Sequence, residues 1–255
     1  MRTLLLCVLL LFNSAVLAQL NESDTLRWQF RSTLTGTFQQ GNVDLLAARL
    51  RADLTTGAVQ HWVYKTQNAG LYQAFYKKKA DLDLFSRHYI YYKPFRRAYP
   101  FGLFYLSTNY RRKINGRYFL GGGYTVQLMK KGGAIIKLSG SLVYEQTRFA
   151  GKQFNRPEWN NTSLLSLWRA TIYSSGSFHL SQNGWRIYYE FFFQPGLSEK
   201  RNHRWQAESG IEFPLRKGFS FNLNYLLSYE DVVITGVRQR DALLSFGVGY
   251  QVKHK

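Results

Sequence analysis

The sequence has little of several features that would each point to a different class of protein. After residue 20 it contains no run close to the roughly 18–20 apolar residues that a membrane-spanning helix requires, which excludes a helical membrane protein. Its single cysteine, Cys7, lies near the start, so the rest of the chain has no disulfide to stabilise it. Proline is also scarce, with five residues, which favours β-strands.

Acidic residues are few as well, because 15 Asp and Glu stand against 34 Lys and Arg, for a net charge of +19. The first residues, MRTLLLCVLLLFNSAVLAQL, combine a basic Arg2, an apolar run and a small residue at Ala18. This pattern predicts a secretory signal peptide over residues 1–18. An exported protein rarely meets nucleic acid, so we expect no nucleic-acid partner. The expected partners are outer-membrane lipid, lipopolysaccharide and small anionic solutes.

The sequence is rich in alternation between apolar and polar side chains. From Phe219 to Tyr229 every second residue is apolar or aromatic and most residues between are polar, which is the period of a strand with two unlike faces. Twelve such segments can be drawn, each about 10–14 residues long, the length of a tilted membrane strand, whereas globular strands are usually about 5–6. We predict an all-β fold, a single antiparallel up-and-down transmembrane β-barrel of about 12 strands over residues 24–255.

The ends of these segments support the same interpretation. The longest links, at residues 149–161, 194–203 and 231–237, follow the seventh, ninth and eleventh segments, so all three lie on one side, as extracellular loops do. The final strand resembles the signal that the barrel-assembly machinery of Gram-negative bacteria reads. We therefore expect insertion by that machinery and a location in the bacterial outer membrane. Aromatic residues gather near the segment ends, as in interfacial girdles: Trp28, Trp62, Tyr91, Tyr92, Tyr110, Tyr118, Tyr144, Trp205, Tyr229 and Tyr250.

Two stretches resemble a known family. Residues 35–54, TGTFQQGNVDLLAARLRADL, are similar to the opening hairpin of the YdiY-like group of salt-induced outer-membrane proteins of unknown function, with the turn at Gly41–Asp44. The glycine-rich stretch at residues 117–128, RYFLGGGYTVQL, resembles the same group. The resemblance implies an outer-membrane barrel and implies no ligand or activity. The turn itself suits a tight hairpin, because Gly and Asn accept positive φ.

Little in the sequence predicts chemistry. The five histidines have no metal-ligand spacing, so we expect no metal, cofactor or catalytic residue and a protein without enzymatic activity. One alternative is a phospholipase-like, lipid-modifying enzyme. His179 and Ser181 are two apart, which places a base and a nucleophile on one face of a strand, and they resemble the His-x-Ser pair of twelve-stranded outer-membrane phospholipases. The alternation places this pair in a periplasmic turn, which favours a polar turn over a catalytic site.

The polar faces of the strands carry many full charges, which we expect to line the lumen. A ring of arginines would make a narrow, anion-preferring channel. Alternatively, pairs of arginine and carboxylate would close the lumen of a structural barrel, and the sequence leaves both hypotheses open. The lumen-lining candidates are Arg27, Arg31, Arg49, Arg51, Asp53, Arg117, Arg169, Arg186, Glu190, Arg204 and Glu208, and the same faces include Asp81, Asp83, Lys137, Glu145, Glu212, Arg238 and Arg240.

Overall fold

Twelve β-strands make up most of the described chain. The structure is a computed structural model that describes residues 22–23, 27–40, 44–57, 61–180, 184–198 and 200–254. The expected signal peptide over residues 1–18 lies outside these residues. The strands are β1 (Trp28–Gln39), β2 (Leu45–Thr56), β3 (Trp62–Phe75), β4 (Lys78–Tyr92), β5 (Ala98–Asn109), β6 (Ile114–Lys131), β7 (Ala134–Phe149), β8 (Leu164–His179), β9 (Arg186–Pro195), β10 (His203–Pro214), β11 (Phe219–Glu230) and β12 (Arg240–His254), with one short 3-10 helix, η1 (Pro157–Trp159).

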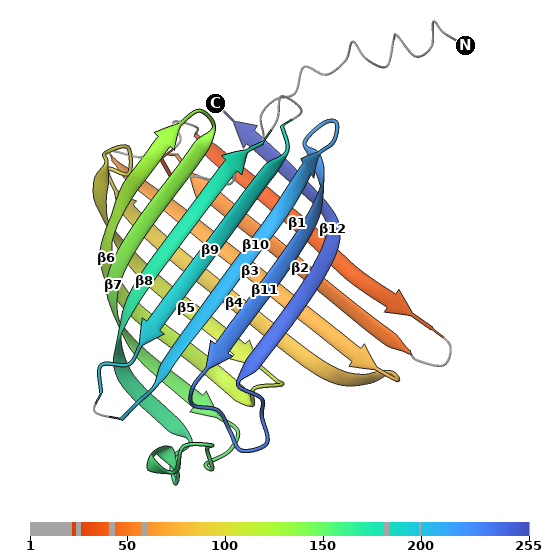
Figure 1. Ribbon diagram of the computed structural model, residues 1–255, viewed down its shortest axis with the longest axis vertical. Helices are drawn as coiled ribbons and strands as arrows, with labels where there is room; N and C mark the ends of the chain where they lie inside the picture. The colour runs from red at the N-terminus through yellow and green to blue at the C-terminus, as the bar shows by residue number, and fades with distance from the viewer. Residues whose placement is uncertain are drawn as a thin grey trace, which may run out of the picture.

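The sheet closes into a barrel (Figure 1). Each strand pairs antiparallel with its neighbours in the sequence, and β1 pairs with β12. β1 begins and β12 ends at the same end of the barrel, where Trp28 pairs with His254, and we call this the terminal end. The long links after β7, β9 and β11 lie at the opposite end, which we call the loop end. The predicted antiparallel barrel of about 12 strands is confirmed.

The wall of the barrel follows the alternation in the sequence. In β11, Phe219 and Phe221 are exposed on the outer surface, whereas Ser220 and Asn222 are buried inside. Most strands present leucine or aromatic side chains outward in the same way. An apolar outer surface of this extent requires apolar surroundings, because soluble monomers rarely expose such a continuous surface. In the described part of the chain, no helix is long and apolar enough to cross a bilayer.

Aromatic pairs lie near both ends of the wall. Trp62 and Tyr92 are in contact at the terminal end, with ring centroids 4.8 Å apart, and Trp205 stacks on Tyr229 at the loop end, with centroids 6.1 Å apart. Tyr91 was expected in a girdle, but it faces the interior and is buried. It lies in an unbroken aromatic and aliphatic run, where alternation does not tell which side chains point outward.

Two strand boundaries differ from the sequence pattern. β6 begins at Ile114, so Asn115–Gly116 lies inside the strand and the turn before it is at residues 110–113. β3 and β4 are joined by a two-residue turn at Tyr76 and Lys77, with φ of 46° and 60°. Such a turn usually carries glycine or asparagine, because other residues are strained at positive φ. Because neither position holds glycine or asparagine, the location of this turn could not be predicted from the residue types.

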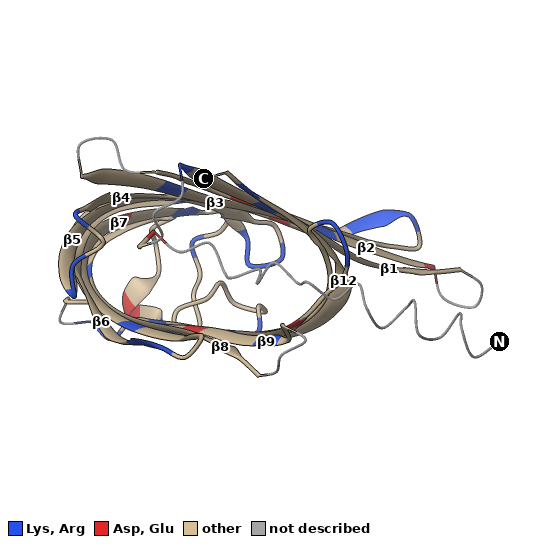
Figure 2. Cartoon of the chain, turned by 90° about the horizontal axis from the view of Figure 1, so that it is seen from above, with Lys and Arg blue, Asp and Glu red and all other residues tan. Residues whose placement is uncertain are grey.

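The pairing of β1 with β12 covers only part of either strand. It runs from Trp28–His254 to Thr35–Gly247 and stops there, whereas the pairing of β1 with β2 continues to Gln39. Beyond Thr35, towards the loop end, β1 is paired with β2 but not with β12, so the hairpin of β1 and β2 separates from the rest of the barrel wall. In the view from above, the hairpin projects sideways from the oval of the barrel (Figure 2).

Candidate functional site

The predicted lumen residues lie where the alternation places them, with few exceptions. Arg27 precedes β1 and is exposed at the rim. Arg238 and Arg240 are also exposed, and Arg240 shares the outward face of β12 with Leu244, so their inward assignment is wrong. The pattern of β12 already shows this, because the inward face begins at Asp241. The other ten candidates take part in ion pairs in the interior: Arg31, Arg49, Arg51, Asp53, Arg117, Arg169, Arg186, Glu190, Arg204 and Glu208.

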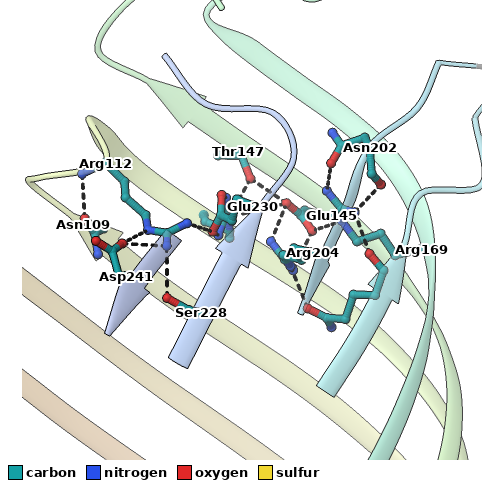
Figure 3. Close-up of polar contacts among 12 residues, drawn as sticks. Asn109, Arg112, Glu145, Thr147, Arg169, Asn202, Arg204, Ser228, Glu230 and Asp241 are labelled. Atoms are coloured by element: carbon teal, nitrogen blue, oxygen red, sulfur yellow. Dashed lines mark hydrogen bonds and ion pairs between the residues drawn. The ribbon is translucent and has the colours of Figure 1, made fainter. Parts of the chain in front are cut away.

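Glu145 of β7 is the centre of the charge cluster nearest to the loop end (Figure 3). Its carboxylate oxygens lie 2.6 Å from Nε of Arg169, 2.8 Å from Nη2 of Arg204 and 3.4 Å from Nε of Arg117. Thr147 donates a hydrogen bond to the same carboxylate at 2.8 Å. Glu145 is 1% exposed, so its buried carboxylate is compensated by these three guanidinium groups and not by water.

A second cluster extends this network across the lumen (Figure 3). Arg117 of β6 donates two hydrogen bonds to Glu230 of β11, at 2.7 and 2.9 Å. Arg112, from the turn between β5 and β6, lies 3.2 Å from Glu230 and 2.7 Å from Asp241 of β12. β6 and β11 are five positions apart in a ring of twelve strands, so this pair joins nearly opposite sides of the barrel.

The middle of the lumen is crossed by Arg51 of β2. Its guanidinium lies 3.0 Å from Asp53 on the same strand, 3.4 Å from Glu208 of β10 and 3.9 Å from Glu190 of β9. β2 and β9 are again five positions apart in the ring. Arg49 lies 3.9 Å from Glu208, so this carboxylate receives two arginines.

A neighbouring pair of arginines shares one carboxylate. Glu212 of β10 accepts from Arg186 of β9 and lies 3.0 Å from Arg31 of β1. Arg31 also donates to Asn222 Oδ1 at 3.0 Å. Arg186 and Glu212 are almost completely buried. Because removing one partner would leave a buried charge uncompensated, these pairs hold the side chains in the lumen.

Glu22, which precedes the barrel strands, occupies the lumen near the terminal end. Its carboxylate lies 2.8 Å from Lys137 Nζ and 3.4 Å from Lys65 Nζ, and it accepts a hydrogen bond from the hydroxyl of Tyr99 at 2.8 Å. Ser23 donates to the carbonyl oxygen of Pro94 at 2.7 Å. Burial alone would raise the pKa of Glu22, but the charges of Lys137 and Lys65 outweigh it and hold the pKa well below its ordinary value.

The space left between these side chains is divided into small cavities. Those lined by the interior residues described above have volumes of about 50, 30, 80 and 10 Å³. A cavity of about 10–15 Å³ holds one water. At that size the described lumen has room for on the order of ten waters between side chains that are paired across it.

The long links fold together over the loop end. Phe154 forms a backbone bridge with Ile234, and both belong to an apolar cluster with Trp159 of η1. Asp231, which is fully buried, lies 2.7 Å from Arg156 and 3.4 Å from the imidazole of His203. The hydrogen bond from Arg156 to Asp231 and the charge of that carboxylate raise the pKa of the Arg156 guanidinium. We call residues 150–163, 196–198, 200–202 and 231–239 the cap.

Sequence reasoning missed several members of this interior network. Glu22 lies before the predicted barrel domain. Arg112 ends the fifth expected segment but lies in a turn in the structure, so alternation did not place its side chain in the lumen. Glu230 was expected to face the lumen but was not among the site candidates. Its partner on β6 could be found only from the closure of the barrel, which no local pattern reports.

Only one residue of the expected His-x-Ser pair lies in the part of the chain that the structure describes. His179 is the last residue of β8, and its Nδ1 lies 2.6 Å from the carbonyl oxygen of Gly133. Ser181 lies outside the described residues. Among the described residues, no group of three or more His, Cys, Asp or Glu side chains could hold a metal ion.

Comparison of the sequence with protein families gave one match. Residues 32–252 match the model of a family described as "Protein of unknown function, DUF481". The chain belongs to this family. The match confirms the resemblance of residues 35–54 and 117–128, which lie within it, to a family without known function. A comparison with curated proteins found no significant match.

Several solved structures are similar to this one. The translocator domain of autotransporter NalP from Neisseria meningitidis has a TM-score of 0.50 and 12% identity over 88% of this chain and 87% of that chain. The NanC porin has a TM-score of 0.48 and 10% identity, over 88% of this chain and 99% of that chain. The beta domain of the Bordetella autotransporter BrkA has a TM-score of 0.46 and 11% identity, over 89% and 99%. The likeness to the NalP domain supports the barrel fold.

Proposed function

We propose that this protein is a bacterial outer-membrane barrel whose lumen is closed to solutes. The observation that carries the proposal is the set of ion pairs that cross the lumen, above all Arg51 with Glu190 and Arg117 with Glu230. Each joins strands that lie nearly opposite each other, and each is buried or partly buried. The apolar outer wall supports a membrane location, because water would not stabilise such a surface.

Both ends of the lumen support the same proposal. The Glu22 carboxylate lies between two lysines at the terminal end, and the cap covers the loop end with an apolar cluster. A channel for small anions would need arginines that are accessible to the solute. Here the lumen arginines are engaged by carboxylates, which favours the closed structural barrel over the anion-preferring channel.

Conductance in a planar bilayer tests the proposal. The mature protein is refolded, its insertion is verified, and current is recorded under a salt gradient. We expect no discrete conductance steps. Steps with an anion-selective reversal potential would instead establish the channel, and Arg49→Ala with Arg51→Ala would then identify the selective residues by shifting that potential.

A further inference from the structure

The outward face of β3 and β4 carries a chain of polar side chains where the wall should be apolar. Ser86 and His88 are two apart on β4, and Ser86 Oγ lies 2.8 Å from His88 Nε2. Tyr64 of β3 places its hydroxyl oxygen 2.6 Å from His88 Nδ1. These residues share the face of Trp62 and Ile90, both exposed on the outer surface. Polar side chains facing lipid are costly, and they commonly mark functional sites.

Ser86, His88 and Tyr64 contact one another in the sequence expected of an activated nucleophile, its base and a group that orients the base. A hydroxyl lies against one ring nitrogen of a histidine, and the other ring nitrogen is held by a third group. With its proton on Nδ1, His88 donates to the oxygen of Tyr64, which leaves Nε2 free to accept the proton of Ser86. Asn68, directly opposite Ser86 on β3, places Oδ1 2.6 Å from Ser86 Oγ. The hydroxyl of Ser86 thus has two acceptors for one proton.

A groove in the outer wall adjoins this chain. It has a volume of about 800 Å³, and Ser86 and Asn68 are among its lining residues, with Leu84 and Leu106 beside them. Towards the loop end it is lined by Arg148, next to the last residue of β7. An apolar groove with a cation near one end suits an anionic lipid, whose acyl chains would contact the leucines.

From this geometry we propose that Ser86, His88 and Tyr64 form an acyl-ester hydrolase site for membrane lipid on the outer wall of the barrel. This goes beyond the closed lumen, which plays no part in it, and it departs from the sequence-based expectation of a protein without enzymatic activity. Ser86 is the nucleophile and His88 the general base. Tyr64 is a positioning residue that fixes the imidazole.

The reaction uses water as the only co-reactant. Ser86 Oγ adds to the acyl carbonyl carbon while its proton passes to His88 Nε2. The ester carbon–oxygen bond breaks, and His88 gives the proton to the departing lipid alcohol. Water then adds to the acyl-serine and loses a proton to His88, the fatty acid leaves, and Ser86 recovers its proton.

The first test uses the refolded mature chain in vesicles of phosphatidylethanolamine and phosphatidylglycerol, with fatty acid and lysolipid measured by mass spectrometry. We expect release by the wild type and a loss of about 10²-fold or more in Ser86→Ala and His88→Gln. The matched control is Ser166→Ala. Ser166 is an outward serine of β8 that accepts a hydrogen bond from Gln146 and does not contact Ser86, His88 or Tyr64, so we expect this variant to keep full activity. Folding of every variant is verified by heat-modifiable gel mobility.

A fluorophosphonate probe gives a readout that does not depend on the natural lipid. We expect covalent labelling of Ser86, identified by peptide mass spectrometry, and its loss in His88→Gln. Tyr64→Phe should lower kcat with little change in KM, because it affects the orientation of the imidazole and not lipid binding. If the Tyr64 hydroxyl had only a structural role, its loss would not lower kcat while leaving KM unchanged.

The groove is tested by filling it. A Cβ added to Gly116, a lining residue, would meet no heavy atom within 4 Å, so Gly116→Leu should fold and obstruct the lipid. Gly140 on β7 has equally open surroundings and does not line the groove, so Gly140→Leu is the matched control. A folded wild type that neither hydrolyses vesicle lipid nor reacts with the probe at Ser86 overturns the inference. The closed lumen is tested separately by bilayer conductance, and failure of the hydrolase assays would leave that proposal unchanged.

Discussion

Arg117 of β6 and Glu230 of β11 form two parallel hydrogen bonds, at 2.7 and 2.9 Å, between nearly opposite sides of the barrel. A guanidinium and a carboxylate that meet in this way define a direction as well as a distance. The pair therefore acts as a cross-brace in the lumen. Its contribution to stability can be measured against that of an exposed arginine.

Replacement of Arg117 by Met should destabilise the protein strongly. Glu145 and Glu230 would each lose a buried partner, and breaking a buried pair costs about 3–5 kcal/mol. The free energy of unfolding in urea, measured in lipid vesicles, gives the value. Arg238→Met, at an exposed position, should change it by less than about 0.5 kcal/mol. Equal losses in both variants would contradict a bracing role.

Removal of the central ion pairs should open the lumen. We expect the triple variant Arg51→Ala, Glu190→Ala and Glu208→Ala to show discrete conductance steps where the wild type shows none, because it removes three long side chains that meet in the middle of the barrel. Arg27→Ala, at the exposed rim, is the control and should remain silent. A silent triple variant that is folded and inserted would mean that the ends, and not these pairs, close the lumen.

Docking of Glu22 should depend on pH in one direction. Its pKa is lowered by Lys137 and Lys65, so its contribution to stability is present above the ordinary carboxyl value of about 4.3 and is lost as the pH falls through the lower folded value. The segment should therefore remain docked at pH 5 and above. Glu22→Gln should release it at every pH, because the amide cannot compensate the two lysines.

Cysteine labelling measures this docking, because Cys7 is the only cysteine of the chain and lies within the expected signal peptide. Ser23→Cys, buried in the structure, should react slowly with a maleimide, and about 10-fold or more faster when Glu22→Gln is added. Equal rates in the two proteins at pH 7 would refute a docked segment. The denatured protein gives the maximal labelling rate for comparison.

The cap should loosen when its buried carboxylate is neutralised. Asp231→Asn weakens the contacts with Arg156, Arg201 and His203 and should raise the rate of proteolysis in residues 150–163 by about 10-fold. Glu158→Gln, an exposed acid in the same cap, is the control. Limited proteolysis with identification of the cut sites tests both, and cleavage at the same rate in the two variants would show that Asp231 does not hold the cap.

The fold could be predicted from the sequence because a barrel wall has a local period. The outward face of β11 can be identified from Phe219, Phe221 and Tyr225 alone, without reference to any other strand. The same period placed Arg51 and Arg117 inside. Where the period is broken, as at Tyr91 in its aromatic run, the assignment failed, and where a turn uses Tyr76 and Lys77 at positive φ, no residue type announces it.

The pairing of the lumen charges could not be predicted in the same way. Which carboxylate meets Arg51 depends on the stagger of strands across the closed ring, and Glu190 and Glu208 are 139 and 157 residues away in the sequence. The Ser86 and His88 pair is a different case. It is visible in the sequence as two polar residues at outward positions of an apolar face, with the same spacing of two as His179 and Ser181.

The short seam between β1 and β12 has a consequence for how deeply the barrel lies in a bilayer. Among the described residues, pairing across the seam ends at Thr35 and Gly247, so from that level the facing edges of both strands lack their ladder partners. Hydrocarbon offers such backbone groups no hydrogen bonds, whereas headgroups and water do. The level of Thr35 and Gly247 therefore sets the boundary of the hydrocarbon layer at this seam, and beyond it the strands lie among headgroups and water.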